Sequence, residues 1–333
     1  MPQNDLPQSP TPAPRQEAPV RARRTGQTVM ITGATSGIGA EFARQLAGQG
    51  HDLVIVSRHR KQLAGKVQAL EAQYGVSVEA ITADLSTQEG IQWTADRLTQ
   101  AERPVSMLIN NAGSGLATDF HASDLQDELA MMRLLIEAPL ALSHAAINAF
   151  LTRGGGRVLN VASVAGLIPD GSYGAAKAWA VSFSRWANVR YRADGVTVTA
   201  LCPGLVRTEF HQRAGIKTAS HPKWMWMDVD DVVREGLTAA AQGQSVCIPS
   251  RRYRSLMRAA RFSPDAVLEW FSRHEAKEMK DSKESKDPQA STVSTVSAQQ
   301  SAPPALPIAP ERSPAHDHPR RLRPVRGEPG RPG

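Results

Sequence analysis

A tyrosine and a lysine stand four residues apart, at Tyr173 and Lys177, in the stretch SYGAAKAWAVSFSRW. Residues four apart in a helix lie one turn from each other on the same face, so both side chains can act on one ligand. A tyrosine ordinarily keeps its proton up to about pH 10, and an ammonium beside it stabilises the phenolate. With Ser163 in a loop just before them, the pair predicts a proton donor that works near neutral pH. The simpler alternative is an exposed helix start without a chemical role.

Residues 32–39 form a glycine-rich turn, TGATSGIG. The turn follows a short β-branched run, Thr28–Thr32, that is typical of a buried strand, and it leads into apolar residues with helical spacing. Gly33, Gly37 and Gly39 let the backbone turn sharply and approach a pyrophosphate, whose charge is met by the N-terminus of the helix. This order of elements predicts a dinucleotide site. A purely structural turn is the alternative.

The second apolar run, Asp52–Ser57, leads into the basic segment RHRK. An acidic residue at this place binds the 2′-hydroxyl of an adenosine ribose, whereas an arginine accommodates a 2′-phosphate. Arg58 can hold a phosphate through two hydrogen bonds. The sequence therefore favours NADP(H) over NAD(H). For His59, Arg60 and Lys61 a solvated basic loop is the alternative.

Apolar strands alternate with helical patterns through the centre of the chain. Strands are predicted at Thr28–Thr32, Asp52–Ser57, 76–82, Val105–Asn110, 157–162, 196–202 and 245–249, and helices at 41–50, 61–74, 90–101, 124–151 and around Tyr173. Strands that are almost continuously apolar belong to parallel sheets covered on both faces. The pattern predicts an α/β fold, a doubly wound parallel sheet of the Rossmann type with right-handed crossovers, in a single domain.

The 23 prolines crowd both ends of the chain, where apolar residues are scarce. Such segments cannot offset the entropy lost on ordering. We therefore expect disordered tails at 1–26 and 278–333, a Rossmann domain at 27–250 and a helical extension at 251–277. The extension has the pattern of two amphipathic helices, for which packing on the domain or on another subunit is favoured over peripheral membrane contact.

The formal net charge of +7 is spread along the chain and forms no single basic face. We therefore expect no specific nucleic-acid partner. Cys202 and Cys247 have no metal-ligand spacing and require no disulfide, so no metal is expected. No basic-then-apolar leader and no run of eighteen apolar residues occurs. The expectation is a cytoplasmic protein without a transmembrane segment.

Six motifs occur in an order and spacing that resemble the short-chain dehydrogenase/reductase family. They are TGATSGIG, ADLS at 83–86, NNAG at 110–113, Ser163, YGAAK at 173–177 and CPGLVRT at 202–208. The resemblance covers residues 28–249. It implies a Rossmann fold that binds NAD(P)(H) and an oxidoreductase that interconverts a ketone or aldehyde and an alcohol.

The resemblance also implies a role for each matching residue. Tyr173 would protonate the carbonyl oxygen, Lys177 would lower the pKa of that tyrosine and hold the nicotinamide ribose, and Ser163 would orient the substrate. Asp84 and Leu85 would contact the adenine. The cofactor-binding set would comprise Gly33, Thr35, Ser36, Gly37, Ile38, Gly39, Arg58, Asp84, Leu85, Asn111, Ala112, Gly113, Tyr173, Lys177, Pro203, Gly204, Val206 and Thr208.

One position departs from the family pattern. Many members carry an asparagine in the long helix before the serine, where it holds a water in a proton relay to the lysine; here that place falls at about Leu135. Pro139 has no N–H and is expected to kink this helix, freeing backbone carbonyls that could hold the water instead. The alternatives are slower turnover, or a chain that binds NADP(H) without catalysis.

Residues 209–228 are the expected substrate lid, because ligands of such sheets bind outside the carboxyl ends of the strands. Its WMWM stretch suits an apolar, adaptable wall, although Trp224 and Trp226 could equally anchor the lid to the core. Four basic lid residues could meet an acidic or thioester-linked substrate, and ordinary surface positions explain them as well: His211, Arg213, Lys217 and Lys223. Residues expected on the opposite wall are Leu167, Ile168 and Asp170.

The leading interpretation is an NADP(H)-dependent oxidoreductase acting on a medium-sized, partly apolar carbonyl or alcohol. An NADP-using epimerase is less favoured, because only a lid and a tail follow Thr208 and such enzymes often have a larger substrate domain. A non-catalytic NADP(H) sensor is supported by Leu135 and opposed by the intact Ser163, Tyr173 and Lys177. By resemblance, copies of the chain would form a homo-oligomer through the helices at 124–151 and 172–193.

Overall fold

The computed structural model describes residues 25–116, 118–209 and 222–260. The chain divides into two units, residues 1–278 and 279–333, and every described residue belongs to the first. The expected tails fall almost entirely outside the described residues, and so does the expected extension beyond Ala260.

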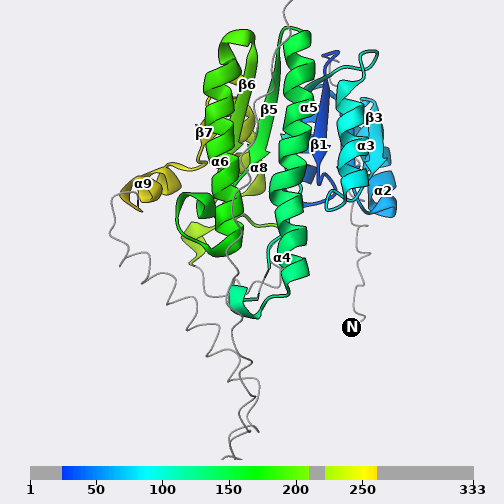
Figure 1. Cartoon of the computed structure of the whole chain (residues 1–333). Helices are drawn as coiled ribbons and strands as arrows, with labels where there is room; N and C mark the ends of the chain where they lie inside the picture. The colour runs from blue at the N-terminus through cyan, green and yellow to red at the C-terminus, as the bar shows by residue number, and fades with distance from the viewer. Residues whose placement is uncertain (1–24, 117, 210–221, 261–333) are drawn as a thin grey trace, which may run out of the picture. The chain divides into compact units, whose positions relative to one another are not determined.

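Seven parallel strands form one sheet in the order β3-β2-β1-β4-β5-β6-β7 (Figure 1). The strands are β1 Thr28–Thr32, β2 Asp52–Ser57, β3 Val78–Thr82, β4 Val105–Asn110, β5 Gly156–Val161, β6 Val196–Leu201 and β7 Val246–Cys247. The predicted fold class is confirmed. β7 is shorter than predicted because this edge strand pairs with β6 only at Ala200 and Leu201.

Helices cover both faces of the sheet, as Figure 1 shows. One layer contains α1 Gly37–Gly48, α2 Arg60–Tyr74 and α8 Val229–Ala241, and the other contains α3 Gln88–Thr99, α5 Ala138–Thr152 and α6 Gly171–Tyr191. The helix α4 Leu125–Met132 lies beyond the ends of the strands (Figure 1) and contacts α6. Within β1, Val29 and Ile31 enter the core under the first layer and Met30 enters the core under the second. Because successive residues of one strand are buried on opposite faces, the strands are apolar without alternation.

The predicted long helix before β5 has a wider turn in its middle. Between α4 and α5 lies a π-helical turn, Arg133–Glu137, in which the Ala138 N–H bonds to the Arg133 carbonyl. Pro139 follows at the start of α5, where its missing N–H breaks the helical ladder. The disruption expected near Pro139 therefore takes the form of a π turn at the position of Leu135.

The whole segment Leu125–Thr152 is long and apolar enough, by length and composition, to cross a membrane, and it is the one described helix with that property. In its most apolar 18-residue window, 39% is buried. Leu142, Ala146 and Phe150 from α5 lie in the core against the sheet. The apolar character of this helix thus follows in part from its place in the core layer.

The order of the strands reverses between β1 and β4, so a crevice opens at the carboxyl ends of these two strands. Thr32 joins the two loops that line it. The Thr32 hydroxyl oxygen accepts the N–H groups of Asn111 and Ala112, both at 3.0 Å, and the Asn111 side-chain amide donates to the Thr32 carbonyl at 2.9 Å. Thr32 itself is buried. These bonds hold the glycine turn and the NNAG turn in one arrangement.

Thr32→Val keeps the shape of the side chain and removes the acceptor of both backbone N–H groups. We expect the free energy of unfolding to fall by about 2 kcal/mol, since each hydrogen-bonding group left unsatisfied costs about 1–3 kcal/mol. Urea unfolding followed by circular dichroism measures this. Thr94→Val is the matched control: Thr94 is equally buried, but its hydroxyl donates only to the Gly90 carbonyl of its own helix. Equal losses in the two variants would contradict the special role of Thr32.

Candidate active site

Ser163, Tyr173 and Lys177 meet beyond the carboxyl end of β5. Ser163 precedes a short 3-10 helix, η3 Val164–Leu167, where its hydroxyl accepts the Ala165 N–H at 3.1 Å. Tyr173 and Lys177 lie on the first two turns of α6. A side-chain hydrogen bond joins Ser163 to Tyr173, and the Lys177 Nζ atom lies 5.6 Å from the centre of the Tyr173 ring. The structure therefore brings together the three residues that the sequence singled out for chemistry.

Two glycines that the sequence analysis missed allow this close approach. A Cβ atom on Gly166 would lie 2.5 Å from the backbone carbonyl carbon of Lys177, and one on Gly174 would lie 3.0 Å from the Ala165 carbonyl oxygen. The Ser163 turn therefore packs directly on the backbone of α6. A glycine inside a helix costs about 1 kcal/mol relative to alanine, so Gly174 was a signal of close packing that the sequence contained.

Lys177 is buried, and its ammonium donates to the Val161 carbonyl at 2.8 Å. Burial disfavours the charged form and lowers the pKa of Lys177 to about 8. At neutral pH the side chain is therefore mostly an ammonium, close to the pH at which it loses its charge.

The pKa of Tyr173 is raised above its ordinary value, which differs from the expectation that Lys177 lowers it. Burial is the largest cause, the negative charge of Asp170 adds to it, and the hydrogen bond with Ser163 opposes it. Asp170 precedes α6 without making a side-chain cap bond to the helix. Asp170 was expected only on a wall of the site, and its effect on the pKa of the tyrosine was not predicted. These causes stabilise the neutral phenol relative to the phenolate.

The place expected for the asparagine of the family pattern falls at about Leu135. The Leu135 side chain is buried in an apolar cluster with Met131 and Ala176, and Tyr173 packs against the cluster. A Cβ atom on Gly113 would lie 3.1 Å from a Leu135 methyl and 3.8 Å from the Lys177 Nζ atom. The Leu135 methyl and the Lys177 ammonium therefore both lie next to Gly113.

The glycine turn has the shape of a phosphate cradle. Gly33 and Gly37 have φ angles of +69° and +55°, which disfavour any side chain. A Cβ atom on Gly39 would fall 2.3 Å from the Asn111 side-chain nitrogen. The turn runs into the N-terminus of α1, whose first N–H groups have no partner within the helix. This arrangement fits the pyrophosphate of a dinucleotide.

The other residues expected to bind the cofactor surround this cradle. Thr35, Ser36 and Ile38 lie on the glycine turn itself, Asn111, Ala112 and Gly113 follow β4, and Pro203, Gly204, Val206 and Thr208 follow β6. The Thr208 Cβ atom lies 3.3 Å from the position of a Cβ on Gly37, and the Pro203 carbonyl accepts the Val164 N–H at 2.9 Å. The β6 loop therefore contacts both the cradle and the segment after Ser163.

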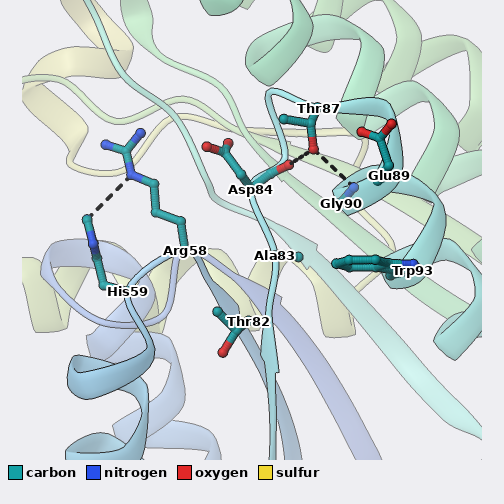
Figure 2. A pocket seen from close by; sticks show the side chains of 9 residues that line it. All are labelled: Arg58, His59, Thr82, Ala83, Asp84, Thr87, Glu89, Gly90 and Trp93. Carbon is teal, nitrogen blue, oxygen red and sulfur yellow. Dashed lines mark hydrogen bonds between the residues drawn. The ribbon is translucent and has the colours of Figure 1, made fainter.

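A cavity of about 430 Å³ lies at the carboxyl ends of β2 and β3. Figure 2 shows its lining, with Arg58 and Trp93 on opposite sides of Asp84. Hydrogen bonds from Ser86 and the positive charge of Arg58 hold the pKa of Asp84 below its ordinary value. Leu85 is buried beside it. Trp93 was not predicted to line this cavity, because its position depends on how α3 packs on the sheet. Its indole is mostly exposed.

The described part of the lid has one exposed tryptophan and one half-buried tryptophan. Trp224 is 57% exposed, so it does not anchor this segment to the core. Trp226 is half-buried and lies in a segment that pairs with the β6 loop at Met227. Of the basic lid residues, Lys223 is exposed. His211, Arg213 and Lys217 lie outside the described residues.

The helices expected to form the subunit contact carry exposed apolar side chains. Leu140 on α5 is 46% exposed, and Trp186 and Val189 on α6 are 56% and 82% exposed. An apolar face of this kind suits a contact with another chain. Self-association through this face stays a prediction.

Comparison with known proteins agrees with the fold and the geometry of the site. Residues 27–218 match the family model described as short chain dehydrogenase. Sulfoacetaldehyde reductase 2 of Chromohalobacter salexigens is 35% identical over 187 residues, which are 55% of this chain and 73% of that protein.

Two solved structures are each 31% identical to this chain. The short-chain dehydrogenase from Sphingobium yanoikuyae in complex with NADPH has a TM-score of 0.64 over 80% of this chain and 99% of that one. The bulky-bulky ketone specific alcohol dehydrogenase from Comamonas testosteroni has a TM-score of 0.62 over 70% of this chain and 92% of that one.

The chain belongs to the short-chain dehydrogenase/reductase family. The family and the relatives support an oxidoreductase that acts between carbonyl and alcohol groups and binds a nicotinamide dinucleotide on the Rossmann fold.

Lys177→Met tests the burial of the ammonium. The pKa gap between 10.5 unfolded and about 8 folded corresponds to about 3 kcal/mol. Because the unfolded chain binds the extra proton between these values, wild-type stability should rise with pH from about 8 to 10.5. The variant lacks this gain. We therefore expect the free energy of unfolding of the variant, minus that of the wild type, to fall by about 3 kcal/mol between pH 7 and pH 10.5. Urea unfolding at the two pH values measures this difference.

Lys61→Met is the control for that experiment, because Lys61 is an exposed lysine of α2. Its difference from the wild type should not change with pH. A Lys177→Met difference that is equally flat would show that the Lys177 ammonium is solvated in the folded protein.

Proposed function

We propose that the protein is an NADP(H)-dependent oxidoreductase that interconverts a ketone or aldehyde and an alcohol, with Tyr173 as the catalytic acid and base. The observation that carries this proposal is the meeting of Ser163, Tyr173 and Lys177 beyond β5, next to the turns that fit a dinucleotide. Carbonyl reduction needs a hydride on carbon and a proton on oxygen. The bound cofactor supplies the hydride, and the three side chains handle the proton.

Each side chain has a separate task in reduction. The Ser163 hydroxyl donates a hydrogen bond to the substrate oxygen and orients it. The Tyr173 hydroxyl gives its proton to that oxygen as the carbonyl carbon accepts a hydride and the C=O π electrons move onto oxygen, which leaves a phenolate. The Lys177 ammonium, held by the Val161 carbonyl, stabilises the phenolate and binds the nicotinamide ribose. In alcohol oxidation the phenolate takes the proton back.

The preference for NADP(H) is supported by Arg58 on the adenine side of the crevice. Its guanidinium borders the cavity that Asp84 and Trp93 also line, and no ion pair within the described residues engages it. A guanidinium in this position can bind a 2′-phosphate through two hydrogen bonds. The Trp93 indole offers an aromatic face for the adenine. The solved relative from Sphingobium yanoikuyae, described as a complex with NADPH, supports the same preference.

The substrate is proposed to be a medium-sized carbonyl compound with an apolar body. Support comes from the apolar cluster beside Tyr173, to which Leu116, Leu135 and Ile136 contribute. The named relatives act on molecules as different as sulfoacetaldehyde and bulky ketones. A screen must therefore include charged aldehydes, bulky ketones and 3-oxo thioesters.

Tyr173→Phe tests the proposed reaction. With NADPH and the substrate panel, absorbance near 340 nm should fall with the wild type, whereas the variant should be about 10²–10⁴-fold slower, the range expected for loss of a general acid. Wild-type kcat/KM should also decline above about pH 8, as Lys177 loses its charge. NADPH binding, measured by fluorescence, should persist in the variant and serves as the control for folding.

A wild-type protein that binds NADPH but is no faster than Tyr173→Phe on every compound would contradict the proposed reaction. The non-catalytic sensor would then be favoured, and Leu135, which replaces the expected asparagine, is the observation that supports it.

Arg58→Ala tests the cofactor preference. Loss of a charge-assisted contact of about 1.5–3 kcal/mol should weaken NADPH binding about tenfold to a hundredfold and leave NADH binding almost unchanged. Arg60→Ala is the matched control, because Arg60 loses the same charge two residues away and does not line the cavity. Titration calorimetry with both cofactors measures this. Equal weakening of NADPH and NADH would contradict recognition of the 2′-phosphate by Arg58.

A further inference from the structure

Tyr253 is a buried aromatic residue on the helix that follows the last strand. This helix, α9, spans Arg251–Ala260. Tyr253 is 5% exposed, although α9 lies at the edge of the described domain and most of its other side chains are not buried. It lies outside the part of the chain that matches the family model, which ends at residue 218. Its burial must therefore be explained from its own contacts.

The ring of Tyr253 lies directly against the backbone of Gly204. A Cβ atom on Gly204 would fall 2.1 Å from the ring Cζ atom and 2.3 Å from Cε1. No side chain at position 204 can coexist with this ring position. Gly204 belongs to the β6 loop, and its neighbour Pro203 accepts the Val164 N–H from the segment that begins at Ser163. The ring thus contacts the loop that borders the catalytic serine.

The Tyr253 hydroxyl joins two chain segments that are about twenty residues apart. It accepts the Leu205 N–H at 3.1 Å and donates to the Met225 carbonyl at 2.8 Å. Beside it, the Met227 N–H donates to the Leu205 carbonyl at 2.8 Å, and Val206 pairs with Met227 in a parallel bridge. One hydroxyl therefore completes the pairing between the β6 loop and the end of the segment expected as the lid.

Glu235 of α8 also holds α9 in position. The Arg254 guanidinium lies 3.1 Å from the Glu235 carboxylate and donates to the Ile248 carbonyl at 3.0 Å. The Ser250 N–H also donates to the Glu235 carboxylate. Because α8 packs on α1 and the sheet, these bonds connect Tyr253 to the rigid core.

We propose that Tyr253 is a positioning residue for the nicotinamide end of the cofactor, holding the Pro203–Leu205 turn between the sheet and Met225. This inference rests on the proposed function, because that turn is where the nicotinamide is expected. Tyr253 touches neither the cofactor nor the reacting atoms and acts through the backbone of Gly204 and Leu205. If Tyr253 has this role, its substitution should weaken the binding of ligands that contain nicotinamide and should not change the binding of ligands that lack it.

Tyr253→Phe keeps the ring on Gly204 and removes both hydrogen bonds of the hydroxyl. The test compares binding of NADPH with binding of 2′-phospho-ADP-ribose, which is the same molecule without nicotinamide, by titration calorimetry. We expect NADPH to bind about five- to tenfold more weakly, the effect of losing one or two hydrogen bonds, while binding of 2′-phospho-ADP-ribose stays unchanged. In turnover, KM for NADPH should rise while the pH profile of kcat keeps its shape.

Tyr74→Phe is the matched control, since Tyr74 is similarly buried and its hydroxyl bonds to Arg44. Tyr74 ends α2, just before β3 begins, and so lies toward the amino ends of the strands, whereas the crevice lies at their carboxyl ends. The control should leave the affinities for both ligands unchanged. Glu235→Gln is a second variant, which removes the carboxylate that holds Arg254 and leaves Tyr253 intact. It should also weaken NADPH binding, but less than Tyr253→Phe does.

Equal weakening of both ligands in Tyr253→Phe, or no weakening of either, would overturn the positioning role. If the wild type shows no turnover but the selective loss of NADPH affinity is observed, the proposed reaction fails and the positioning role stands. If the wild type reduces a carbonyl and the ratio of the two affinities is unchanged, the positioning role alone fails. A wild type with equal affinity for both ligands would show that the turn holds no nicotinamide, which overturns the inference.

Discussion

The hydrogen bonds of Thr32 are the constraint on which the site depends. The pairing of β1 with β4 places the starts of the two following loops side by side, but the strand pairs end at Ile31 and Ile109, before the loops themselves. One threonine oxygen receives two N–H groups from the β4 loop, and Asn111 returns a bond to the Thr32 carbonyl. Gly39 then has to be glycine, because Asn111 fills the space of a side chain there. The shape of the glycine turn and the shape of the crevice therefore both depend on the hydrogen bonds of Thr32.

The end of the candidate site that holds Ser163, Tyr173 and Lys177 is built by close packing around a buried charge. Gly166 and Gly174 let the Ser163 turn approach α6, and this approach buries the Lys177 ammonium against the Val161 carbonyl. Burial lowers the pKa of Lys177 and raises the pKa of Tyr173, because each loses solvation of its charged form. The two shifts move the two pKa values apart. They favour a neutral phenol and leave the ammonium with a proton that is lost more easily than from a solvated lysine. A neutral phenol still carries the proton that a carbonyl oxygen would need, and an ammonium beside it would stabilise the phenolate that is left behind.

Most of the fold and the catalytic cluster could be predicted from sequence because their signals are local. The β1, β2 and β4 strands are continuous apolar runs, and the spacing of Tyr173 and Lys177 places them on one helix face. The residues that were missed have weaker signals. Trp93 lines the cavity at the ends of β2 and β3 only through the packing of α3, which no local spacing predicts. Asp170 stands three residues before Tyr173 at the start of α6, but its effect on the pKa of the tyrosine also depends on how the phenol is enclosed, which spacing does not give.

Tyr253 extends the same argument to the end of the domain. The glycine turn and the Ser163–Tyr173–Lys177 set are defined by what a dinucleotide and a carbonyl require, so they can be recognised by residue type and spacing. The β6 loop has no such requirement along most of its length, and its conformation must be set by whatever packs on it. Here that is a tyrosine from α9, whose ring needs glycine at position 204 and whose hydroxyl needs the Leu205 N–H and the Met225 carbonyl. A helix outside the family match thereby becomes part of how the site is shaped.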